Sequence, residues 1–187
     1  AVDKAGRKSE EAYQLAKASK EIKRDMEAIL LSNQVTNAGS AAGARVLGGI
    51  QTWIATNGDF ASAGSTSGSL GTTARPDGTE RTFTETILKN VVQQVYTAGG
   101  NPEVLMVTPA HKQTVSAFAG IAAQRYMAPS DQPTTIVGAA DVYMSDFGTL
   151  SVVPNRFMVS SNSADDVALV LDTEFLETAF LRPFQTN

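Results

Sequence analysis

The sequence of 187 residues contains no cysteine and only one histidine, His111. Disulfide bonds, thiolate metal sites and cysteine nucleophiles are therefore excluded, and a zinc site would lack most of its usual ligands. No run of about 18 apolar residues occurs, so the sequence predicts no membrane-spanning helix. An excess of positive charge is also lacking, because 15 Lys and Arg stand against 19 Asp and Glu, a net charge of −4. Phosphate binding needs clustered cations, so this composition argues against sequence-specific nucleic-acid binding.

Length and composition are those of a folded protein with one large or two small domains. Hydrophobic residues make up 42% of the chain and charged residues 18%, which argues against wholesale disorder. The chain begins at Ala1 without a methionine or a signal peptide. We therefore expect it to be a processed chain or part of a longer one.

Charged residues are distributed unevenly along the chain. Residues 1–32 hold 7 basic and 6 acidic side chains, whereas residues 131–187 hold 2 basic and 8 acidic ones. The net acidity of the protein is therefore a property of its C-terminal third.

The charge-dense first segment also carries an apolar stripe with the period of an α-helix. Ser9 followed by Glu10 and Glu11 is typical of a helix start, because acidic side chains favour the positive end of the helix dipole. The sequence predicts one long helix over about residues 7–32, either a surface helix on a small core or a strut between parts of the molecule or neighbouring subunits. The stripe consists of Ala12, Leu15, Ile22, Met26 and Ile29.

Residues 36–79 form a glycine-rich segment that holds nine of the 15 glycines. Small residues fill most of the remainder, and a loop of this length is usually functional or disordered. A short apolar island includes Trp53, the only tryptophan. We predict that Trp53 pins the loop onto the body of the protein or onto a neighbour.

From residue 80 onward the pattern predicts a compact α+β unit. A helix is expected to start at Thr84 and to end before Gly99, followed by a buried strand over 104–107 and a second helix over about 110–118. The remaining apolar runs predict strands over 135–137, 142–144, 150–153, 157–159, 167–171 and 178–181.

Motifs for catalysis or cofactor binding are incomplete. The glycine-rich stretches 39–43 and 64–68 lack the lysine of a phosphate-binding loop, so we interpret them as flexible loops. The triplet 146–148, Asp-Phe-Gly, occurs without the other kinase motifs, and no nucleophile elbow accompanies His111. We interpret His111 as a helix cap or a surface residue rather than as part of a catalytic triad.

Carboxylates offer the one remaining route to metal chemistry. With one histidine and no cysteine, only a divalent cation held by oxygen ligands is possible. Asp141, Asp146 and Asp172 are the candidate ligands, and the competing interpretation is that these are solvated acids in turns.

Several segments, taken in their order along the chain, point to one protein family. They are Ala1–Glu10 running into Ala12–Lys17, Glu21–Glu27, Val104–Pro109, Tyr143–Leu150 with Val153–Arg156, and Phe180–Gln185. Together they resemble tailed-bacteriophage major capsid proteins with the Hong Kong 97-type fold. The resemblance extends over nearly the whole chain.

The resemblance implies an α+β capsid fold in two parts. Residues 1–79 would form a peripheral-type region, with the spine helix at about 7–32 and the glycine-rich loop at 36–79. Residues 80–187 would form the compact axial-type α+β domain. On this resemblance, we expect the given sequence to lack the N-terminal arm, the extended loop and the last C-terminal segment of the family.

The function that the resemblance implies is structural and not enzymatic. The subunit would self-assemble into the icosahedral shell that encloses the phage genome, with copies of itself as partners in pentamers and hexamers. Portal, scaffold or decoration proteins would be further partners, and no catalytic residue, cofactor, metal or membrane is implied. The protein would be made in the host bacterial cytoplasm and would reside in the virion.

Contacts between subunits are expected at charged residues that lie largely off the apolar stripe of the first helix. The candidates are Lys17, Lys20, Lys23 and Arg24, together with Trp53. Two functions of other classes stay open at this point. One is a small α+β enzyme or ligand-binding domain with an oxygen-ligated metal, and the other is a phage tail or adhesion module.

Overall fold

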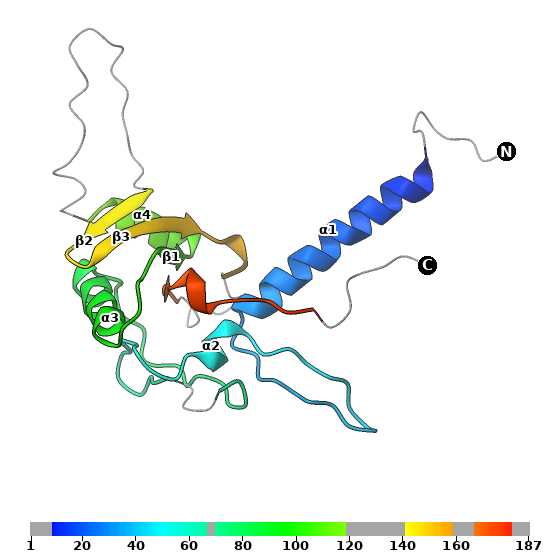
Figure 1. The fold of residues 1–187 in the computed structure, drawn as a ribbon, viewed down its shortest axis with the longest axis horizontal. Helices are drawn as coiled ribbons and strands as arrows, with labels where there is room; N and C mark the ends of the chain where they lie inside the picture. Colours follow the sequence, from blue (N-terminus) through cyan, green and yellow to red (C-terminus); the bar gives the residue numbers. More distant parts are fainter. Residues whose placement is uncertain (1–8, 67–69, 119–140, 159–166, 181–187) are drawn as a thin grey trace, which may run out of the picture. The chain divides into compact units, whose positions relative to one another are not determined.

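The computed structural model describes residues 9–66, 70–118, 141–158 and 167–180 (Figure 1). The chain divides into two compact units. The first consists of Ala1–Thr56 and Gly64–Asp77, and the second of Asn57–Ala63 and Gly78–Asn187. Helices and a four-stranded sheet both occur, so the architecture is mixed α+β, as the sequence predicts.

A long helix, α1, spans Glu10–Leu31 in the first unit and confirms the helix predicted there. Ser9 is its N-cap, because the Ser9 Oγ accepts a hydrogen bond from the Ala12 N–H at 3.3 Å. Acidic residues occupy the first turn, where the helix dipole stabilises negative charge. Residues 10–25 are all exposed, and the one buried residue of the helix is Leu31.

The glycine-rich segment after α1 forms a narrow hairpin followed by a short helix. Antiparallel bridges join Asn37 to Val46 and Ser40 to Gly43, and α2 then spans Ile50–Trp53. Among the described residues of the first unit, Leu31 is the only buried large hydrophobic side chain, whereas three polar side chains are buried: Gln51, Thr52 and Arg75. Hydrogen bonds therefore contribute much of the stability of this unit.

In its described residues, the second unit contains two helices, a four-stranded sheet and two 3-10 turns. In chain order these are α3 (Glu85–Thr97), β1 (Val104–Val107), α4 (Pro109–Ser116), β2 (Val142–Ser145), β3 (Gly148–Pro154), η1 (Arg156–Met158), β4 (Leu169–Leu171) and η3 (Thr173–Phe175). The strand order is β2-β3-β1-β4. Strand β1 runs parallel to β3 and antiparallel to β4, while β2 and β3 form an antiparallel hairpin.

The hydrophobic core of the second unit combines one face of the sheet with α3 and α4. Burial alternates along β1, so Leu105 and Val107 are buried while their neighbours in the strand are only partly covered. The other buried members of the cluster are Leu88, Val92, Val115, Phe118, Tyr143, Leu150 and Val152. This cluster fixes the positions of both helices on the sheet.

Most predicted elements of the second unit are confirmed, and two predicted strands are wrong. Residues 157–158 belong to the 3-10 turn η1, because the Asn155 Oδ1 accepts a hydrogen bond from the Phe157 N–H at 2.8 Å and turns the chain. Residues 178–180 form no strand, since they are exposed and pair with no strand of the described chain. The strand predicted over 135–137 lies outside the described residues.

Candidate subunit interface

Helix α1 presents two different faces to solvent. At about 100° per residue, Lys17, Lys20 and Arg24 fall within about 60° of one another, and Leu15 and Ile22 fall on the opposite side of the helix. Leu15 is 46% exposed and Ile22 is 41% exposed. The N-terminal part of the predicted apolar stripe is therefore left uncovered.

The four cations predicted on this helix are all exposed. Within the described part of the chain, the charged groups of Lys17, Lys20, Lys23 and Arg24 take part in no hydrogen bond or ion pair. Four other cations are paired with carboxylates at 2.6–3.0 Å, namely Arg75, Arg81, Lys89 and Lys112. The α1 cations are thus not used in ion pairs within the described chain, and they are available to a partner.

Trp53 lies at the end of α2 and is 49% exposed, so it is not a core residue. Its covered part lies against Gly71, where an added Cβ would come within 2.8 Å of the indole Cζ2. Gly71 has φ +80°, which only glycine adopts readily. Its N–H donates to the Thr52 carbonyl at 2.9 Å, and its carbonyl accepts from the Thr36 N–H at 2.7 Å. The indole therefore covers a turn that brings both ends of the glycine-rich segment together.

In the second unit, Asp59 makes a group of contacts that the sequence did not predict. Arg81 donates to the Asp59 carboxylate and to its carbonyl oxygen, both at 2.6 Å. The Asn90 side chain donates to the other carboxylate oxygen at 3.2 Å. The hydrogen bond from Arg81 lowers the pKa of Asp59, the Asn90 hydrogen bond adds to this, and burial opposes it. These residues are 22 and 31 positions away from Asp59 in sequence, so no local motif reveals the contact.

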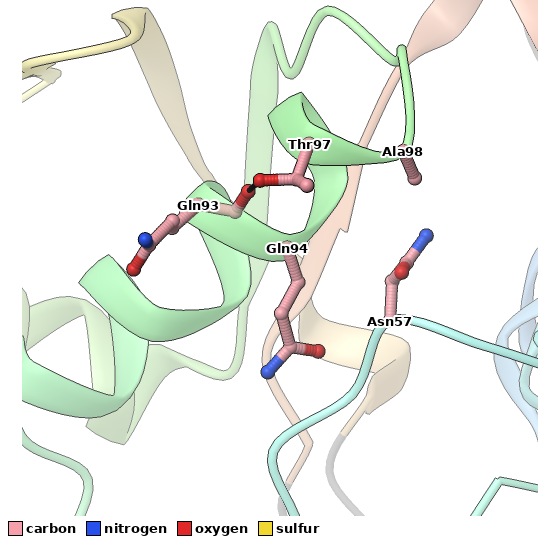
Figure 2. Close-up of a pocket in the computed structure, with 5 residues that line it drawn as sticks. All are labelled: Asn57, Gln93, Gln94, Thr97 and Ala98. Carbon is pink, nitrogen blue, oxygen red and sulfur yellow. Dashed lines mark hydrogen bonds between the residues drawn. The ribbon is translucent and has the colours of Figure 1, made fainter.

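A pocket of about 360 Å³ opens between residue 57 and the C-terminal half of α3 (Figure 2). Its lining residues are Asn57, Gln93, Gln94, Thr97 and Ala98. The Thr97 hydroxyl donates to the Gln93 carbonyl at 2.8 Å. The lining contains carboxamides, one hydroxyl and no titratable group, so it offers hydrogen bonds but no general acid, base or activated nucleophile.

The three carboxylates considered as metal ligands do not form a site. Asp141 pairs with the Lys112 ammonium at 3.0 Å, and Asp172 accepts hydrogen bonds from two backbone N–H groups at 2.8 and 3.1 Å. Throughout the described ranges, no group of three His, Asp or Glu residues is placed to hold a metal ion. The metal-dependent alternative therefore gains no support.

His111 is partly buried, which corrects its interpretation as a cap or surface residue. Its ring packs against Phe83 with the centroids 5.0 Å apart, and its buried Nδ1 has no hydrogen-bond partner among the described residues. The cap of α4 is Thr108, whose Oγ1 accepts a hydrogen bond from the His111 N–H at 3.2 Å. In a catalytic triad a carboxylate orients the histidine ring through that nitrogen, and no such group contacts His111 within the described chain.

Tyr143 of β2 joins the start of α3 through Glu85. The Tyr143 hydroxyl donates to the Glu85 Oε1 at 3.1 Å, and the same oxygen pairs with Lys89 at 2.9 Å. Burial, followed by the nearby Glu85 carboxylate, raises the pKa of Tyr143 to about 12. The hydrogen bond from Lys89 holds the pKa of Glu85 below its ordinary value. This cluster is a structural link between helix and sheet.

A family model described as SU10 major capsid protein matches residues 1–187, which include both units. No curated protein matches the chain. None of the helices in the described ranges combines the length and the hydrophobicity needed to cross a bilayer.

Proposed function

The chain belongs to the SU10 major capsid protein family, and we propose that its helix α1 is a surface through which copies of the subunit contact one another. A major capsid protein is a structural component of the virion, and copies of this chain assemble into the phage shell. The interface residues proposed on α1 are Lys17, Lys20, Lys23 and Arg24.

The exposure of α1 is the observation that carries this proposal. Every residue from 10 to 25 is exposed, although helices in proteins gain most of their stability from tertiary packing of an apolar face. Its cations have no partner within the described chain, and Leu15 and Ile22 are open to solvent. A neighbouring subunit that covers the apolar side and pairs with the basic side would account for both features. Complementary charge between copies would also set their register.

Trp53 provides a second proposed contact. Half of its surface is exposed although the other half packs on Gly71. Tryptophan is enriched at protein interfaces because it offers a large apolar area and one polar N–H. We propose that a neighbouring subunit covers the exposed half.

The wider assignment follows the same reasoning. We propose that residues 1–79 act as the peripheral-type region and residues 80–187 as the axial-type domain, which would gather in pentamers and hexamers. Portal, scaffold and decoration proteins are proposed further partners, and synthesis is proposed in the host bacterial cytoplasm. No catalytic role is proposed for the pocket beside α3, because its lining residues carry no titratable group.

Light scattering and electron microscopy of the full chain test this function. Large particles of discrete size are expected, in which α1 amides exchange hydrogen far more slowly than in the free subunit. A chain that stays monomeric, or particles in which the α1 amides and the Trp53 fluorescence are unchanged from the free subunit, would contradict the proposed contacts.

A further inference from the structure

We propose that one corner of the second unit binds the basic face of helix α1 in a second copy of the chain. The corner consists of Glu103, Asp172, Glu174, Phe175 and Leu176. This inference rests on the proposed function and deepens it, because it names the surface that the α1 cations meet.

Hydrogen bonds assemble the corner from two segments about 70 residues apart. The Thr173 Oγ1 donates to the Glu103 Oε2 at 2.8 Å, and the Glu103 N–H donates to the Leu171 carbonyl at 3.0 Å. The Asp172 carboxylate accepts from the Asn101 N–H at 2.8 Å. Three carboxylates thus gather beside η3, where the start of β1 meets the end of β4. No cation of the described chain is paired with any of them.

An apolar patch adjoins these carboxylates. Phe175 is 76% exposed, the largest value among the large hydrophobic residues of the described ranges, and Leu176 beside it is also exposed. Two adjacent large apolar side chains in water, rimmed by polar groups, are typical of a surface that a protein partner covers.

Charge complementarity identifies the partner as α1 of another copy. Lys17, Lys20 and Arg24 lie on one face of α1 over about 10 Å of helix axis, and Tyr13 lies on that same face and is exposed. Cations would meet the carboxylates of the corner, and the Tyr13 ring would meet Phe175, since aromatic pairs attract beyond the area they bury. The opposite face of α1 lacks this basic stripe, so charge selects which side of the helix binds.

A charge swap in the full chain tests the pairing. One variant carries Glu103→Lys and Glu174→Lys, a second carries Lys20→Glu and Arg24→Glu, and a third combines all four. Each double reversal is expected to slow particle formation, followed by light scattering, by about tenfold or more, because like charges then face each other. The combined variant is expected to recover most of the parental rate. All effects should shrink at 1 M salt, where the screening length falls to about 3 Å.

A matched control changes net charge equally elsewhere in the second unit. Glu80 and Asp146 are exposed carboxylates outside the corner, and Glu80→Lys with Asp146→Lys should assemble within about twofold of the parent. Circular dichroism confirms that each variant is folded. Equal slowing by the control, or a combined variant no faster than either double reversal, would overturn the pairing.

Cross-linking tests the same contact without any charge reversal, so it applies even if the charge-reversed variants do not fold. Because the chain has no cysteine, Ala16→Cys beside the basic face and Thr178→Cys beyond the corner can each be introduced alone. Particles formed from a mixture of the two chains should yield Ala16–Thr178 cross-links with a short bis-maleimide, and these links necessarily join different copies. Mixed particles without the link overturn this inference alone. If the parental chain forms no particles, the proposed function fails, and this inference fails with it.

Discussion

Asn33 and Arg75, 42 residues apart, hold each other through a pair of hydrogen bonds. The Asn33 Nδ2 donates to the Arg75 carbonyl at 2.8 Å, and the Arg75 N–H donates to the Asn33 Oδ1 at 2.8 Å. The buried Arg75 guanidinium then reaches the Gln51 Oε1 at 3.4 Å and pairs with Asp77 at 2.9 Å. The Gln51 side chain in turn donates to the Leu31 carbonyl at 2.9 Å. This network ties the end of the glycine-rich segment to the end of α1 in a unit with little apolar core.

Asn33→Ala should loosen this unit. The change removes two hydrogen bonds to the Arg75 backbone in a partly buried position, at a cost of about 1–3 kcal/mol in the free energy of unfolding. Hydrogen exchange of the Arg75 amide together with denaturant unfolding measures the effect. Asn37→Ala is the control, because its side chain accepts from the exposed Gly39 N–H, and it should cost at most about 0.5 kcal/mol. If Asn33→Ala and Asn37→Ala lower the free energy of unfolding equally, the hydrogen bonds between Asn33 and Arg75 contribute no more than an exposed hydrogen bond does.

Trp53→Ala should destabilise the free subunit less than loss of a core tryptophan would. Half of the indole is exposed, so roughly 100 Å² of apolar contact with the turn at Gly71 is lost, about 2 kcal/mol. Assembly should suffer more than folding if a neighbour covers the other half. Chemical denaturation measures the loss of folding stability, and the protein concentration needed for particle formation measures the loss of assembly.

Trp53→Phe separates these contributions, because it retains an aromatic ring and removes the indole N–H. It should restore most of the folding stability. Normal assembly of both variants would contradict a subunit contact at Trp53, and an unfolding free energy unchanged in Trp53→Ala would contradict the anchoring role at Gly71.

Stability should depend on pH through Glu85 and Tyr143. Glu85 has a lowered pKa in the folded state, so its contribution is present above its ordinary pKa of 4.5 and is lost as the pH falls through the folded value. Tyr143 has a pKa raised to about 12 from 10.0, so its contribution is present below pH 10 and is lost as the pH rises toward 12. Thermal melting should therefore show a plateau with an acidic and an alkaline decline.

Two substitutions show which residue causes the acidic decline in thermal stability and which causes the alkaline one. Glu85→Gln should flatten part of the acidic decline, and Tyr143→Phe should flatten the alkaline one, because each removes the titrating group. Glu80→Gln serves as the control, since Glu80 is an exposed carboxylate outside this cluster. Melting curves of Tyr143→Phe that fall between pH 10 and 12 as steeply as those of the parent would refute the role given to Tyr143.

The parts of the fold that the sequence could predict are those set by local pattern. Helix α1 follows from the cap at Ser9 and a stripe of period 3.6, and β1 follows from an apolar run that Pro109 limits. The Asp59–Arg81 contact and the corner around Thr173 depend on residues far apart in sequence, so no spacing rule reveals them. The run 178–180 has the apolar pattern of a strand but pairs with no strand of the described residues, and pattern alone does not supply a pairing partner.

The charge of α1 gives the most direct test of its place in the shell. Lys20 and Arg24 are exposed and unpaired within the described chain. Reversing both to Glu should therefore change the free energy of unfolding of the free subunit by no more than about 0.5 kcal/mol per residue. Particle yield in electron micrographs should nevertheless fall strongly, because a neighbouring acidic surface would then meet like charge.

Arg45→Glu with Arg156→Glu is the matched control, since both are exposed cations outside α1 and the net charge changes equally. If the α1 variant melts like the parent and forms normal shells, the helix is not a charged contact between subunits. If it unfolds while the control does not, these side chains act within the subunit, and their assignment to the interface is wrong.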